Sequence, residues 1–224
     1  SELKKYAGSD SFLVVTGESA SIYKDPQRST LLQRASMGTI IPRASLAKAS
    51  DADSANYTVW MPYRKQDGSA GLAKAYLRKK SDVSTKFPVY SQANIIRQAF
   101  KLLGARYGWG GQYNGRDCSG FVHDVFLSMG IAFPRDSKQQ AIIGIQLGFF
   151  EYAEDDVEKK KVLDSARPGL TLLKMPHHQM IYLGKYNGQY YVIHSTWAER
   201  IGYDQSKDEK KRINQVVVSD LNLN

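Results

Sequence analysis

One stretch decides the fold and the chemistry of this chain: YGWGGQYNGRDCSGFV, residues 107–122. It places Cys118, the only cysteine among the 224 residues, after a glycine-rich loop and before an amphipathic run that predicts a helix. The free N–H groups and the dipole of a helix N-terminus favour a thiolate, and the N–H groups can also stabilise an oxyanion. This placement makes Cys118 a candidate nucleophile, whereas the cysteine taken alone favours the more common role of a small buried apolar residue.

Helix signals lie on both sides of this stretch. Apolar residues at helical spacing over 91–103 predict one helix, which Gly104 would end. A second helix is expected over 118–129, with Asp117 as its N-cap residue and Gly130 just beyond its end.

The rest of the C-terminal half is expected to contain one more helix and then strands. The helix is predicted over 134–147, and a mixed, acidic-then-basic connection over 149–161. Strands are predicted over 170–174, 179–184 and 189–195, with an edge strand over 216–218. Asn187-Gly188 between the second and third strands is a strong hairpin signal. Helices followed by an antiparallel sheet predict an α+β domain.

The N-terminal part has a different pattern. Short strand-like runs punctuated by Gly, Pro and Asp fill residues 11–77, with a polar loop over 46–54. They predict a small all-β barrel or sandwich. Residues 81–90 are expected to be a linker, so the predicted domains are 1–85 and 86–224.

Two of the four histidines are expected to be neighbours. His178 opens one strand of the hairpin and His194 ends the other, so both lie at the same edge of the sheet. There His178 could take the proton of the Cys118 thiol while His194 orients its ring. His177 faces the other way in the strand, and His123 lies in mid-helix. Because no Cys-x-x-Cys motif, His-Glu-x-x-His motif or second cysteine is present, we expect no metal site.

Net charge and composition indicate which classes of molecule the protein could bind. The net charge of +9 and the pI near 9.4 indicate an anionic partner or a well-solvated surface. The positive charge is not interleaved with aromatic residues along one stripe, so nucleic acid is not expected. No apolar run approaches the ~20 residues of a membrane helix, and no signal peptide is visible in this chain.

Four blocks of the C-terminal part resemble the NlpC-type cell-wall cysteine peptidases. They are YGWGG with RDCSGFV (107–122), PRDSKQQ (134–140), HQMIYLG (178–184) and VIHS (192–195). The resemblance implies a papain-like α+β fold without a cofactor. It also implies hydrolysis of peptidoglycan stem peptides or muropeptides, at the bond between the γ-carboxyl group of D-glutamate and an L-diamino acid.

By this resemblance Cys118 matches the nucleophile, His178 the base and His194 the third polar residue. The positions that match a substrate-binding groove are Tyr107, Asp117, Ser119, Asp136 and Ser137. For Asp117 and Ser137 a purely structural role in helix capping is an equal alternative.

The N-terminal blocks SIYKDP (21–26), MGTI (37–40) and DGSAG (67–71) resemble the bacterial SH3-like domain. In this family such a domain implies substrates with a free N-terminal L-Ala. The expected location is the cell envelope, periplasmic or secreted, with cytoplasmic recycling of wall fragments as the alternative. Other functions left open are a peptidoglycan amidase or acyltransferase on the same scaffold, and a non-catalytic wall-binding protein.

Overall fold

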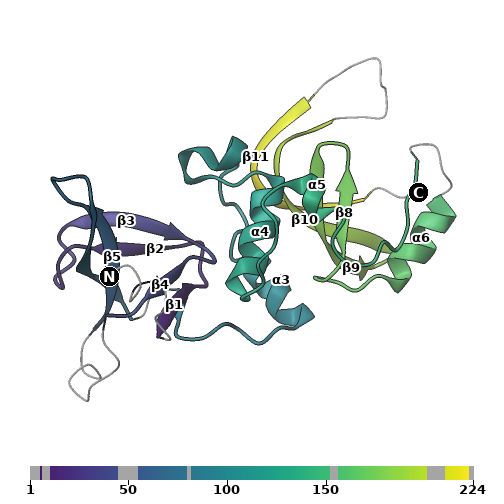
Figure 1. The fold of residues 1–224 in the computed structure, drawn as a ribbon. Coiled ribbons are helices and arrows are strands. Elements are labelled where there is room, and N and C mark those ends of the chain that lie inside the picture. The colour runs from purple at the N-terminus through teal and green to yellow at the C-terminus, as the bar shows by residue number, and fades with distance from the viewer. Residues whose placement is uncertain are drawn as a thin grey trace. The chain divides into compact units, whose positions relative to one another are not determined.

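The computed structural model describes residues 6, 11–44, 55–79, 82–151, 156–200 and 210–221 (Figure 1). The polar loop expected over 46–54 lies outside these residues. Antiparallel sheets and a few helices make the protein α+β, as the sequence predicts. None of the helices in the described part of the chain is long and apolar enough to cross a membrane.

Two compact units divide the chain. One comprises Ser1–Pro88 with Leu127–Gly130, and the other comprises Val89–Phe126 with Ile131–Asn224. The first unit contains the strands β1 (Phe12–Val15), β2 (Ser19–Tyr23), β3 (Leu31–Ser36), β4 (Ile40–Pro42), β5 (Asn56–Arg64), β6 (Ala70–Arg78) and β7 (Val83–Ser84). They form two antiparallel sheets, ordered β4-β1-β7 and β3-β2-β6-β5.

The strands of the first unit enclose one apolar core. Its buried residues are Leu13, Val15, Ala20, Ile22, Ala35, Ile41, Val59, Ala75 and Leu77. Two strands were not predicted: β3, and β7, which lies in the expected linker and pairs with β1. The likeness of this unit to an SH3-like barrel stays a prediction.

The second unit begins with helices. They are α3 (Gln92–Phe100), the 3₁₀ segment η1 (Trp109–Asn114), α4 (Cys118–Ser128, except its last two residues), α5 (Ser137–Gln140) and α6 (Asp156–Ser165). The first two predicted helices are confirmed, and glycines in the left-handed region follow both, Gly104 with φ 80° and Gly130 with φ 82°. A residue with a side chain would be strained in this conformation, so the two glycines let the chain turn shortly after each helix ends.

Two predictions about the next segment are wrong. The helix expected over 134–147 is the four-residue α5, because Gly144 adopts φ 86° and the apolar residues after Gln140 are exposed. Ile142 is 82% exposed and Ile145 90%. The expected connection over 149–161 contains most of α6, whose acidic first turn and i,i+3 pairs to lysines favour a helix.

A four-stranded antiparallel sheet completes the second unit, in the order β11-β10-β9-β8 (Figure 1). Its strands are β8 (Leu172–Met175), β9 (His178–Tyr186), β10 (Gln189–Arg200) and β11 (Lys210–Asp220). The hairpin between β9 and β10 is confirmed, with positive φ at both Asn187 (49°) and Gly188 (82°). Helix α6 covers part of the sheet, where Leu163 and Ala166 pack with Met180, Tyr182, Tyr190 and Val192.

Candidate active site

Cys118 is the first residue of α4 and is half-buried. Its thiol makes a long hydrogen bond to the backbone carbonyl of His177, with 4.0 Å between sulfur and oxygen, and the backbone N–H of Gln179 hydrogen-bonds to the sulfur. These two residues flank His178 at the start of β9. The structure therefore brings the thiol against the backbone on both sides of His178.

The loop and helix around Cys118 are held by Asp117. Its carboxylate accepts hydrogen bonds from the backbone N–H groups of Gly120 at 2.7 Å and Gly110 at 3.0 Å. It also accepts from the Ser119 hydroxyl at 3.3 Å and from Nη2 of Arg135 at 2.7 Å. The bond to Gly120 is the predicted N-cap of α4, which fixes the first turn of the helix and with it the cysteine.

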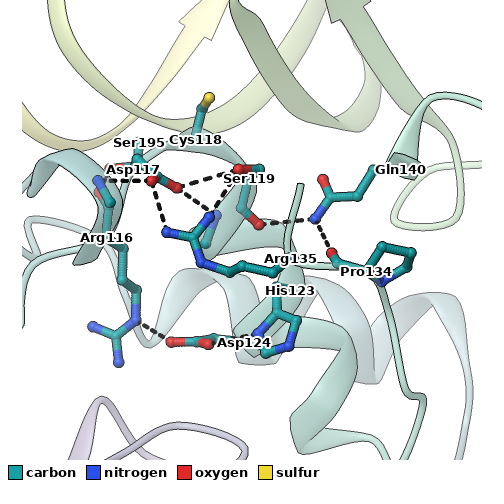
Figure 2. A network of polar contacts seen from close by, with 12 residues as sticks. Arg116, Asp117, Cys118, Ser119, His123, Asp124, Pro134, Arg135, Gln140 and Ser195 are labelled. Atoms are coloured by element: carbon teal, nitrogen blue, oxygen red, sulfur yellow. Dashed lines mark hydrogen bonds and ion pairs between the residues drawn. The ribbon is translucent and has the colours of Figure 1, made fainter. Parts of the chain in front are cut away.

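Arg135 extends this network (Figure 2). Its second terminal nitrogen donates to the Ser119 hydroxyl at 3.0 Å. Burial by itself would raise the pKa of Asp117, but the hydrogen bond and charge of Arg135, with the Gly120 N–H, lower it on balance. Figure 2 shows the Cys118 sulfur pointing away from this ion pair. The ion pair thus stabilises the first turn of α4 on the side away from the thiol, which stays available for reaction.

A buried glutamine joins α5 to the same helix start. Gln140 is 2% exposed, and its amide nitrogen donates to the carbonyls of Ser119 at 3.0 Å and Pro134 at 2.6 Å. Figure 2 shows it on the other side of Ser119 from Arg116.

His178 and His194 meet as predicted. Nε2 of His178 lies 2.6 Å from Nδ1 of His194, and the two rings pack edge to face. The register pairs Ile193 with Ile181, so His194 follows the last paired residue of β10. His178 lies diagonally opposite His194 on the same face of the sheet, at a distance that two imidazole rings can span. The hairpin therefore places the two histidines together.

Burial keeps both histidines neutral at neutral pH. It lowers the pKa of His194 to about 4, and burial together with neighbouring His194 lowers the pKa of His178 to about 4. The thiol departs from the sequence expectation of a stabilised thiolate, because burial and the negative charge of Asp117 raise the pKa of Cys118. The N–H groups of Gln179 and Ser119 offset this rise only in part. At neutral pH the site therefore holds a protonated thiol and two neutral imidazoles.

One buried hydrogen bond ties the nucleophile segment to the histidine strand. The hydroxyl of Ser195, next to His194 in β10, donates to the backbone carbonyl of Arg116 at 2.6 Å. The Arg116 side chain is itself fixed by an ion pair with Asp124 of α4 at 2.8 Å. His123, the mid-helix histidine, lies 3.0 Å from the other oxygen of Asp124.

The residues matched to a substrate groove are mostly engaged with the protein. Tyr107 is 8% exposed, packs edge to face against Trp109, and its pKa is raised to about 12 by burial and by Cys118 and Asp117. Ser119 is bonded to Arg135, as described above. Asp136 caps α5, accepting from the N–H of Lys138 at 2.8 Å, and Ser137 is the first residue of that helix. Substrate contacts by these residues stay predictions.

Several residues of the site carried no role in the sequence analysis. They are Arg135, Gln140, Ser195, and two residues near His194: Ser219 of β11 and Glu199 of β10. Arg135 and Gln140 stand inside the PRDSKQQ block, which was a signal for them. The others depend on strand pairings that join distant parts of the chain.

Comparison with known proteins places this site in context. The profile of the NlpC/P60 family matches residues 104–218. A gamma-D-glutamyl-L-lysine dipeptidyl-peptidase from Bacillus cereus is 28% identical over 200 residues, covering 84% of this chain and 51% of that protein. A protein of the same name from Bacillus subtilis is 32% identical over 77 residues, 34% of this chain and 26% of its own length. The chain thus spans about half the length of the first of these relatives.

Two solved structures have a similar fold. An NlpC/P60 endopeptidase from Photobacterium damselae subsp. piscicida superposes with a TM-score of 0.72 at 20% identity, over 98% of this chain and 48% of that one. An NlpC/P60 family protein from Bacillus cereus gives a TM-score of 0.59 at 23% identity, over 99% of this chain and 61% of that one. At these identities the likeness shows the fold.

Proposed function

Because the chain belongs to the NlpC/P60 family, we propose that it hydrolyses a peptide bond in peptidoglycan stem peptides with Cys118 as the nucleophile. One observation carries the proposal: the Cys118 thiol lies against the backbone on both sides of His178, and the His178 ring is bonded to His194. A thiol, a neutral base and a group that orients the base are the parts that nucleophilic acyl transfer needs.

The reaction would run in two halves. His178 takes the thiol proton, and the sulfur attacks the peptide carbonyl to form a tetrahedral oxyanion. The N–H group of Ser119, at the start of α4, lies next to the sulfur and would stabilise this oxyanion. His178 then gives the proton to the leaving amine, which departs and leaves a thioester. A water molecule, deprotonated by His178, attacks the thioester and releases the carboxylic acid and the free thiol.

The names of the two Bacillus relatives support a γ-D-glutamyl bond as the target. We propose the bond between the γ-carboxyl group of D-glutamate and an L-diamino acid, in a stem peptide with a free N-terminal L-Ala. Cleavage would release the dipeptide L-Ala-D-Glu, in keeping with the dipeptidyl-peptidase names. We also propose that the first unit is an SH3-like domain and that the protein is located in the cell envelope.

The test uses defined peptides and mass spectrometry. The substrates are L-Ala-γ-D-Glu-L-Lys, the same peptide with meso-diaminopimelate in place of lysine, and N-acetylated versions of both. We expect release of L-Ala-D-Glu from the free peptides only. Cys118→Ala and His178→Gln should lose at least about 10³-fold in kcat. Ser165→Ala, a change to an exposed residue of α6, is the matched control and should leave kcat unchanged.

The products distinguish the alternatives. Cleavage between the sugar lactyl group and L-Ala in a muropeptide would indicate an amidase, and transfer of the dipeptide to an added amine would indicate an acyltransferase. Full hydrolysis by Cys118→Ala would overturn the proposal. Binding to wall material without any cleavage would favour a wall-binding protein.

A further inference from the structure

We propose that Ser219 and Glu199 are positioning residues for the base: through His194 they fix the tautomer in which His178 presents an unprotonated Nδ1 to the thiol. The catalytic consequence of this inference rests on the proposed function. The tautomers themselves are a property of the free protein and can be measured without a substrate.

The chain of bonds begins at Glu199. Its carboxylate oxygen Oε1 lies 2.8 Å from the hydroxyl of Ser219, which is the donor. An ionised carboxylate can only accept, and a serine hydroxyl has one proton to give. The direction of the first bond is therefore fixed, from Ser219 to Glu199.

That direction fixes the next bond. Oγ of Ser219 lies 3.0 Å from Nε2 of His194. Because the hydroxyl proton is already given to Glu199, Oγ must accept here, and Nε2 of His194 must carry the proton. Neutral imidazole has one N–H, so Nδ1 of His194 is left as a bare acceptor.

The same reasoning sets the base. Nδ1 of His194 accepts at 2.6 Å from Nε2 of His178, which must then be the protonated nitrogen of the His178 ring. The Nδ1 of His178 is consequently free of a proton. This nitrogen is the one nearest to the residue's own backbone, and the Cys118 sulfur contacts the backbone at His177 and Gln179. Because Nε2 is bonded to His194, Nδ1 is the ring nitrogen of His178 that remains for the thiol.

The same line of hydrogen bonds also places a negative charge, that of Glu199, on the far side of His194 from the base His178. Glu199 Oε1 is 3.7 Å from Nε2 of His194, whose side chain is 6% exposed. When His178 takes the thiol proton, the imidazolium forms at the other end of this line of bonds. A carboxylate at that position favours the charged ring, as a buried aspartate does in other triads. Nδ1 of His178 is therefore both unprotonated at rest and supported once it is charged.

The first test is spectroscopic. With ¹⁵N-labelled histidine, long-range proton–nitrogen correlation spectra of the free protein at pH 7 distinguish protonated from bare ring nitrogens. We expect Nε2 protonated and Nδ1 bare in both His178 and His194. His178→Gln and His194→Gln assign the signals. A protonated Nδ1 in His178 would overturn the inference, whatever the protein does to peptides.

The second test breaks the chain at its source. In Glu199→Gln the amide can donate to Ser219 as well as accept, so the whole line can reverse and protonate Nδ1 of His178. We expect mixed tautomers in the spectra and a fall in kcat of about tenfold, with KM within about twofold. The acidic limb of the kcat profile should move to lower pH, because the charge of Glu199 raises the pKa of His178.

Matched variants separate positioning from folding. Asp220→Asn removes a neighbouring exposed negative charge outside the chain of bonds and should match the wild type. Ser219→Thr keeps the hydroxyl and should retain kcat, whereas Ser219→Ala should lower it with unchanged thermal stability. Wild-type kcat and tautomers in Glu199→Gln would overturn the inference. Absence of hydrolysis by the wild type would count against the proposed function alone, since the spectra decide the tautomers independently.

Discussion

The nucleophile and its base are held by polar networks of opposite form. Asp117 accepts from four donors on three segments of chain, so the start of α4 is supported several times over. On the sheet side, consecutive hydrogen bonds join His178 to His194, His194 to Ser219, and Ser219 to Glu199. A branched network tolerates the loss of one bond, whereas a line transmits every change to its end. The network around Asp117 thus fixes the position of Cys118, and the line of bonds from Glu199 fixes which ring nitrogen of His178 carries the proton.

Acidification should produce the largest change, and on the sheet side. Burial lowers the pKa of both histidines from 6.5 to about 4, so the unfolded chain takes up protons first as the pH falls below 6.5. Stability present above pH 6.5 is then lost as the pH falls towards 4. For the first proton taken up by the pair the loss is about 3 kcal/mol, at about 1.4 kcal/mol for each pKa unit.

Urea unfolding at pH 7 and at pH 4.5 measures this effect. The double variant with His178→Gln and His194→Gln should show a much flatter dependence over this range. His123→Gln, a change to the mid-helix histidine outside the line, should keep the wild-type dependence. Equal slopes in the double variant and the wild type would show that another group controls the acid response.

Removing Arg135 should test the branched side with a smaller effect. Arg135→Met deletes two charged hydrogen bonds, but its side chain is 45% exposed and Asp117 keeps three other donors. We expect a loss of about 1–2 kcal/mol in unfolding free energy and less than a fivefold change in kcat. Arg135→Lys, which cannot reach both partners in the same geometry, should recover part of the stability.

The matched control for charge is Lys138→Met, which removes an exposed positive charge from neighbouring α5. It should leave the urea midpoint within experimental error of the wild type. If Arg135→Met were as stable as this control, the network around Asp117 would not depend on the ion pair.

The smallest expected effect is that of substituting Gln179, the buried glutamine next to His178. It is compared with the substitution of Gln140, the buried glutamine that joins α5 to the start of α4. Gln179 is fully buried, and among the described residues its amide has no hydrogen-bond partner. Gln179→Met keeps the shape and should stabilise the fold by about 1 kcal/mol. Gln140→Met should destabilise it by about 1–2 kcal/mol, because that amide donates to two carbonyls. Thermal melting of both variants is the measurement, and a loss of stability in Gln179→Met would reveal a partner for its amide.

The sequence predicted the parts of the site that depend on local signals. Asp117 and Gly130 delimit α4 and so place Cys118 at a helix start. The Asn187-Gly188 turn pairs the two strands, and a register shift between Tyr191 and Val192 then puts His178 and His194 on the same face of the sheet. Both signals act within a few residues of the element that they set, which is why a single sequence reveals them.

The failures arise where local and distant effects compete. The sequence predicted a helix over 134–147, but Gly144 takes a left-handed conformation, and Ile142 and Ile145 beyond α5 are exposed. The acidic and basic residues three positions apart in α6 favour a helix, although the sequence analysis predicted a connection there. The thiol pKa moved opposite to expectation, because burial and Asp117 outweigh the helix N-terminus.

The bonds from Ser219 to His194 and Glu199 depend on tertiary pairing. β11 must pair with β10 along most of its length, across a bulge between Thr196 and Ala198. No local pattern encodes such a contact, so these two residues could only be found from the structure.

The Asn187-Gly188 turn has a consequence for the order of folding. His178 and His194 lie 16 positions apart in the chain, and a hairpin of this kind forms in about 1–10 µs. Cys118 must close a loop of 59 residues to reach His177, and a contact that distant forms more slowly. The base and its orienting ring are thus assembled first, and the nucleophile joins them when the helix docks on the sheet. Until then the thiol has no partner to activate it, so chemical competence is among the last properties that the folding chain acquires.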